Sequence, residues 1–212
     1  MRSSTSLGLL MASITALSWS ALAIGLKFSL QFASPGTVVW FRMATAFLGL
    51  SSFFALRKPT AFRTLKRPPA LGVIAGICLA SNYFAYMKGV ELTSASNTQI
   101  MIQSGPMALL LIGVLYFRET LNRWQWVGAA CAVLGFSLFY LDQVAQDAQN
   151  SSQLVLGNLW IFFAALTWAF FATGQKILSS KWAPSQVNLL IFLVASLTLT
   201  PLVHWSEWAH WS

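Results

Sequence analysis

Amide side chains lie inside an otherwise apolar run of the sequence. The run contains Asn97, Gln99 and Gln103, and Pro106 follows them. Gln99 and Gln103 are four residues apart, so a helix places them on one face, and Pro106 leaves the carbonyl of Ile102 without its helical donor. Amides buried in apolar surroundings need partners. Two interpretations remain open for this face: it lines a water-filled solute cavity, or it forms hydrogen bonds between helices.

Aromatic residues form a second group that could bind a solute. Asn82 and Tyr86 are also four residues apart, and Trp19 and Trp168 each lie near the middle of an apolar run. Aromatic faces can hold the apolar part of a small molecule while a hydroxyl orients it. Ordinary packing between helices is the alternative. The predicted cavity lining, from both groups together, is Trp19, Asn82, Tyr86, Asn97, Gln99, Gln103 and Trp168.

Arg42 is a cation deep within an apolar run, where its insertion into a membrane costs about 2.5–3.5 kcal/mol. We predict a structural ion pair between Arg42 and Glu91. The alternative is that Arg42 attracts the carboxylate of a solute. Lys27 and Lys88 lie nearer the ends of their runs, and we expect their long side chains to reach the membrane surface.

The sequence lacks the residue sets that enzymatic or metal chemistry requires. His204 and His210 are its two histidines, and its five carboxylates lie at the ends of apolar runs or between them. An intramembrane protease or acyltransferase would need an Asp pair, a Ser/His set or a His cluster. We therefore predict that the chain is not an enzyme and has no metal site and no cofactor.

The composition predicts a membrane protein. Hydrophobic residues make up 57% of the chain and charged residues 8%, whereas soluble domains carry about 25% charged residues to cover their surface. The net charge of +8 would suit nucleic acid. The basic residues, however, fall in short gaps between apolar runs instead of on one face, which indicates membrane topology and not a nucleic-acid partner.

Seven apolar runs are long enough to cross a bilayer as helices. Basic residues gather in 57–69 and 118–123, whereas the loop 142–153 carries Asp142 and Asp147. The positive-inside rule then places the N-terminus in the cytoplasm. We predict an all-α, multi-pass integral membrane protein whose first partner is the lipid bilayer. The predicted spans are 7–28, 35–56, 70–90, 94–117, 124–141, 156–177 and 185–204.

The chain contains an internal repeat. Residues 7–38 align with residues 156–187 without a gap, at an offset of 149 residues. The matches that are least common in membrane segments are Trp19 with Trp168, Gly25 with Gly174, Lys27 with Lys176 and Pro35 with Pro184. Because the offset spans five predicted helices, an odd number, the two copies cross the membrane in opposite directions. Such inverted repeats are typical of secondary transporters.

Several stretches resemble the EamA-type drug/metabolite transporters, and the resemblance covers essentially the whole chain. They include "WFRMATAFL" and "YFAYMKGVELTSASNTQ", followed by Pro106 and by Glu119 at the end of the same span. The resemblance implies two inverted five-helix repeats, a substrate cavity between them, and export of amino acids or other small metabolites by alternating access. It also implies a bacterial inner-membrane location.

The chain departs from that family pattern because it holds five helices of the first repeat and two of the second. We expect the first repeat at 1–142, an external loop at 143–155 and the start of the second repeat at 156–212. We interpret the chain as a fragment or truncated product of such an exporter. The alternative is a half-transporter subunit that needs another chain, such as a second copy in a homo-oligomer, and does not transport alone.

Overall fold

The computed structural model describes residues 2–57, 62–146 and 151–210, and these residues are helical with short connections and no strand. Six spans, with α5 and α6 counted as one, are long and apolar enough to cross a membrane. The first predicted span lies in α1, a continuous helix of 28 residues. The predicted all-α, multi-pass membrane fold is therefore confirmed. The elements are α1 (Arg2–Ser29), α2 (Pro35–Arg57), α3 (Arg63–Lys66), α4 (Ala70–Leu92), α5 (Ala95–Met101), α6 (Ser104–Leu115), α7 (Arg123–Gln146), α8 (Ser151–Leu178), α9 (Pro184–Leu199), η2 (Thr200–Leu202) and η3 (Trp205–His210).

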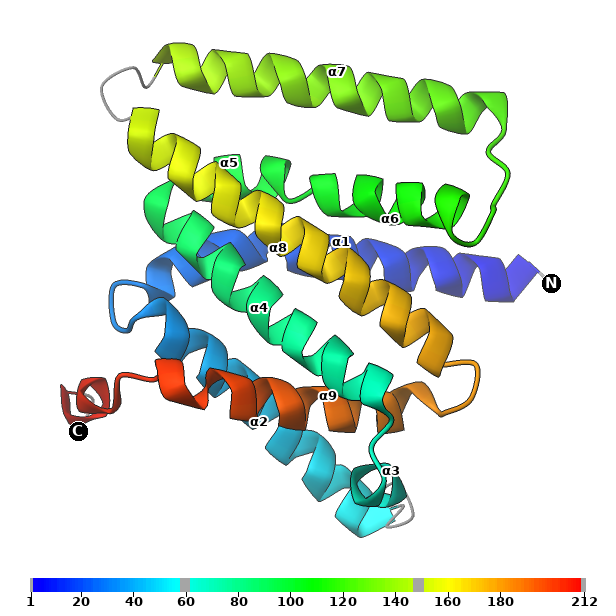
Figure 1. The fold of residues 1–212 in the computed structure, drawn as a ribbon, viewed down its shortest axis with the longest axis vertical. Helices are drawn as coiled ribbons and strands as arrows, with labels where there is room; N and C mark the ends of the chain where they lie inside the picture. The colour runs from blue at the N-terminus through cyan, green and yellow to red at the C-terminus, as the bar shows by residue number, and fades with distance from the viewer. Residues whose placement is uncertain (1, 58–61, 147–150, 211–212) are drawn as a thin grey trace.

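Helix α4 is the centre of the arrangement, and α8 lies along it in the opposite direction (Figure 1). Gly89, near the end of α4, contacts Ile161 in the first half of α8. Ala75, near the start of α4, contacts Gly174 near the end of α8. The core therefore joins a helix of the predicted first repeat to a helix of the predicted second repeat.

Helix α9 approaches α4 at two glycines spaced four residues apart. A Cβ atom on Gly72 would lie 2.7 Å from Cδ2 of Leu190, and one on Gly76 would lie 2.6 Å from Cβ of Val194. Both glycines are buried. Glycine at these positions lets the two backbones come close, which is how helices gain packing energy where lipid offers no hydrophobic driving force.

Helix α7 stands apart from the other helices (Figure 1). None of its described side chains, residues 123–142, is buried within the chain. Leu134 and Leu138 are 63% and 68% exposed. An apolar helix that is exposed all round is compatible with lipid contact along its length.

The predicted span 94–117 is not one continuous helix. It divides into α5 and α6, with a break at Ile102 and Gln103. Pro106 cannot donate to the Ile102 carbonyl, but this carbonyl is not left free, because the backbone N–H of Gly105 donates to it at 2.9 Å. Proline cannot supply the bond from four residues ahead, so the chain tightens and the residue three ahead supplies it.

The segment after α9 holds the start of α2. Nε1 of Trp40 donates to Oγ1 of Thr200 at 3.1 Å. The Glu207 carboxylate accepts hydrogen bonds from the backbone N–H and the hydroxyl of Ser34, at 3.1 and 3.2 Å. We call this contact the C-terminal clasp. It fixes the end of α9 against the α1–α2 connection.

We predict that Gly76→Ala lowers the thermal unfolding temperature of the protein in detergent. The new Cβ would meet a branch point of Val194 at 2.6 Å and the backbone oxygen of Ile191 at 3.2 Å, and neither moves easily. Overpacking of this kind costs about 1–3 kcal/mol. Gly49→Ala is the matched control, because no atom of the described residues lies within 4 Å of its Cβ position and alanine favours a helix by about 1 kcal/mol. Equal shifts for both variants would contradict the close α4–α9 contact.

We predict that acid loosens the C-terminal clasp. Burial acts to raise the pKa of Glu207, but hydrogen bonds from Thr37 and Ser34 and the nearby His204 outweigh it and lower the pKa from its usual 4.5. A lowered pKa in the folded protein means that the contribution to stability is present above pH 4.5 and is lost as the pH falls through the folded value. The thermal unfolding temperature should therefore fall more steeply between about pH 6 and about pH 3 for the native chain than for Glu207→Gln. Parallel pH profiles would show that the clasp does not depend on this carboxylate.

Candidate solute-binding site

Three of the predicted cavity residues join α1, α4 and α5 through a chain of hydrogen bonds. The hydroxyl of Tyr86 donates to Oε1 of Gln99 at 3.0 Å. Nε2 of Gln99 donates to the backbone carbonyl of Trp19 at 2.8 Å. Tyr86 is buried and Gln99 half-buried, whereas the Trp19 indole is 59% exposed. The bonds satisfy the two polar side chains and leave the indole face free.

Arg42, on α2, lies beside this chain of bonds. Its guanidinium carbon is 4.9 Å from the centroid of the Tyr83 ring, which lies three residues before Tyr86 on α4. Nη1 of Arg42 is buried and has no hydrogen-bond partner among the described residues. We call Trp19, Arg42, Tyr83, Tyr86 and Gln99 the polar cluster.

The structure does not bring Arg42 and Glu91 together. Oε2 of Glu91 lies 2.7 Å from Nζ of Lys88, one helical turn away on the same helix. Arg42 is seven residues into α2, which is about 10 Å along the helix axis, whereas Glu91 lies in the last turn of α4. The expected ion pair is replaced by a local one because the two residues lie at different depths.

Asn82 and Asn97 bond to α8 and do not join the polar cluster. Nδ2 of Asn82 donates to the carbonyl of Ala164 at 2.7 Å, and Nδ2 of Asn97 donates to Oδ1 of Asn158 at 2.7 Å. All three asparagines are buried. Oδ1 of Asn97 and Nδ2 of Asn158 are buried and have no hydrogen-bond partner in the described part of the chain. At Asn97 this geometry is the interhelical hydrogen bonding that was its alternative interpretation, and Asn82 makes a bond of the same kind.

Gln103 and Trp168 border the break between α5 and α6. The Gln103 side chain is exposed at the break itself. Trp168, half-buried on α8, packs against Gly105, where a Cβ would lie 3.2 Å from Cε3 of the indole. Two further cavity candidates therefore flank the irregular backbone.

Lys27 was not predicted to have a role near the candidate site. Its Nζ donates to the carbonyls of Val90 at 2.6 Å and Thr93 at 2.9 Å, where α4 ends. A cation is favourable at the C-terminal end of a helix. The sequence signal for a structural role of Lys27 was that a lysine, Lys176, stands at the equivalent position of the second predicted copy. Nζ of Lys176 donates to Oε1 of Glu119 at 2.8 Å. Lys27 thus ties α1 to the α4–α5 junction.

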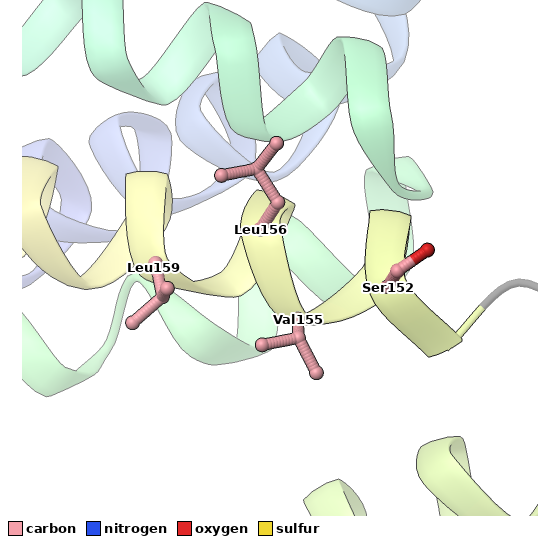
Figure 2. A pocket seen from close by; sticks show the side chains of 4 residues that line it. All are labelled: Ser152, Val155, Leu156 and Leu159. Atoms are coloured by element: carbon pink, nitrogen blue, oxygen red, sulfur yellow. The ribbon is translucent and has the colours of Figure 1, made fainter.

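An open hollow of about 410 Å³ lies elsewhere, on the first turns of α8 (Figure 2). Its lining is aliphatic apart from one hydroxyl, and none of the predicted cavity residues contributes to it. Such a surface suits a lipid chain better than a polar solute. The lining residues are Ser152, Val155, Leu156 and Leu159.

Comparison with known proteins places these features in a family. Residues 6–141 match the EamA-like transporter family. The chain belongs to this family. A similar EamA-type protein is an uncharacterized transporter of Haemophilus influenzae, 29% identical over 205 residues that cover 95% of this chain and 66% of the relative. The uncharacterized inner membrane transporter YhbE of Escherichia coli is 24% identical over 217 residues, which cover 100% of this chain and 68% of YhbE.

The chain therefore spans about two thirds of the length of these relatives. No solved structure matches it. The resemblance to EamA transporters that the sequence motifs indicated is confirmed, and the family is one of transporters and not of enzymes.

We predict that Asn97 and Asn158 stabilise the fold jointly. Asn97→Ala should remove the bond to α8 and leave the Asn158 amide buried and unpaired, which costs about 1–3 kcal/mol. Adding Asn158→Ala should then cost little more, since the unpaired amide is removed with it. A double-mutant cycle measured by thermal unfolding in detergent should show the coupling. Additive losses would show that the bond contributes nothing.

Proposed function

We propose that this chain takes part in moving a small metabolite or amino acid out of the cell by alternating access, and that the solute binds at the polar cluster. The observation that carries the proposal is the helix break at Ile102 and Gln103, beside residues that join α1, α4 and α5. Irregular backbone within a membrane is tolerated where it is buried or lines a cavity. In secondary transporters such broken helices build the solute site.

The directions of the helices support the proposed inverted repeat. The end of α1 lies at the end of α4, where Lys27 contacts Val90. The end of α8 lies near the start of α4, where Gly174 contacts Ala75. Helices α1 and α8 therefore run in opposite directions relative to α4, as copies in an inverted repeat should.

The helix ends give the same support. Helix α1 ends at Ser29 and α8 at Leu178, whereas α2 begins at Pro35 and α9 at Pro184. Both pairs are separated by the repeat offset of 149 residues. Inversion of the two copies would let them expose a shared site first to one face of the membrane and then to the other.

The proposed orientation has the N-terminus in the cytoplasm of a bacterial cell, in its inner membrane. The basic connections 57–69 and 118–123 support it. The printed name of YhbE describes an inner membrane transporter, which supports the same location for this chain.

A second candidate function is a half-transporter subunit that works only with another chain. The observation that favours it is the greater length of the relatives, of which this chain covers 66% and 68%. On this alternative, expression of the chain alone gives no solute movement. Co-expression with a chain that supplies the remaining helices would restore it.

We predict that cells expressing the chain release one or more solutes from a panel of amino acids and metabolites faster than cells without it. Trp19→Ala and Gln103→Ala should each slow that release several-fold, since they remove a proposed face and a proposed hydrogen-bonding group of the site. Trp126→Ala on α7 is the matched control, because its indole is 56% exposed against 59% for Trp19 and it lies away from the polar cluster. Efflux is measured with isotopically labelled solutes and corrected for the amount of protein in the membrane.

Equal rates for Trp19→Ala and Trp126→Ala would contradict the placement of the site. Absence of release for the whole panel by the chain alone, with release restored by a second chain, would favour the half-transporter. Absence of release in both cases would contradict the proposed transport.

A further inference from the structure

Arg42 carries a charge within the span α2 that no salt bridge among the described residues neutralises. Its Nη1 atom is buried and unpartnered. Its guanidinium carbon lies 4.9 Å from the centroid of the Tyr83 ring. Three carboxylates of the chain are bonded to other groups: Glu91 to Lys88, Glu119 to Lys176 and Glu207 to Ser34.

The free-energy cost of placing Arg42 in the membrane exceeds the stabilisation from its contact with Tyr83. Insertion of an arginine at the middle of a membrane helix costs about 2.5–3.5 kcal/mol. Contact with an aromatic face returns about 0.5–2 kcal/mol, and a buried donor without a partner costs about 1–3 kcal/mol more. An ionisable residue retained in a membrane at such a cost is a functional hypothesis by default. The missing partner is an anion.

We propose that Arg42 binds the carboxylate of the transported solute, so that the solute is a monocarboxylate. This inference rests on the proposed function and deepens it, because Arg42 belongs to the same polar cluster. A guanidinium presents parallel N–H groups that match both oxygens of a carboxylate. The bound carboxylate neutralises the charge and satisfies Nη1, while the Tyr83 ring lies beside it for the rest of the solute and Tyr86 follows one helical turn later on α4.

The charges around the cluster favour a carboxylate over a phosphate. A phosphate group carries more negative charge and needs a second cation. Lys27 is bonded to the carbonyls at the end of α4, and Lys88 is bonded to Glu91. Among the described residues of the polar cluster, Arg42 is the cation, and its single charge suits one negative charge.

The test is solute binding by the purified chain in detergent, which needs no transport. The probes are acetate, isobutyrate and benzoate, each beside its neutral amide, with inorganic phosphate as a separate probe; affinity is measured by calorimetry. At least one carboxylate should bind the native chain about tenfold or more tightly than its amide. Arg42→Gln should weaken that binding about ten- to a hundredfold, and Arg42→Lys less, because lysine keeps the charge and loses the paired donors.

Arg57→Gln is the matched control, since it makes the same change at the exposed end of the same helix, and it should leave the affinity unchanged. The proposal is overturned if amides bind as tightly as carboxylates, if phosphate binds more tightly, if Arg42→Gln binds like the native chain, or if no carboxylate binds. The comparison of carboxylate with amide uses the native chain, so it remains decisive even if Arg42→Gln fails to fold.

The two proposals fail in different ways. Carboxylate binding without any release from cells would leave the Arg42 site standing and contradict transport. Release of neutral solutes at the same rate by the native chain and by Arg42→Gln would leave transport standing and overturn the carboxylate site.

Discussion

A polar group buried in the hydrocarbon core of a membrane is stabilised by a partner inside the protein, because the core has no water to offer. Helix α4 makes several of these bonds. Its Asn82 bonds to α8, its Tyr86 bonds to α5, and its last carbonyls receive Lys27 from α1. One helix thus connects both members of the proposed repeat. Its polar residues are both the means of assembly and the border of the proposed site.

Glycine residues pack differently in the two copies of the proposed repeat. Gly157 and Gly174 on α8 lie against α4, whereas their counterparts Gly8 and Gly25 on α1 have nothing within 4 Å among the described residues. A repeat that is inverted should offer α1 an equivalent neighbour. The relatives of the EamA-like family are longer than this chain, which covers 66% and 68% of two of them. Among the described residues, the glycine face of α1 therefore lacks the close neighbour that α8 has in α4.

Much of the fold could be predicted from the sequence, because the length of an apolar run and the residues that interrupt it act locally. Pro35 and Pro184 begin α2 and α9, and Pro106 accompanies the break between α5 and α6. The site was harder to predict, since polarity shows that a residue needs a partner and not which partner it finds. Asn82 and Asn97 were predicted to line a cavity because they are polar, yet both bond to α8. Which neighbour satisfies a side chain depends on helix packing, which the pattern of one chain does not encode.

Two cations show how packing separates a structural residue from a candidate ligand-binding one. Lys27 and Arg42 both sit in predicted spans, and each carries a charge that the membrane penalises. Lys27 meets helix-end carbonyls at 2.6 and 2.9 Å, so its cost is repaid within the fold. Arg42 meets an aromatic face and leaves one nitrogen buried and unpaired. A lysine could not replace it there without losing the paired donors. What distinguishes the two is the unfilled hydrogen bond at Nη1 of Arg42, which the proposed carboxylate of the solute would complete.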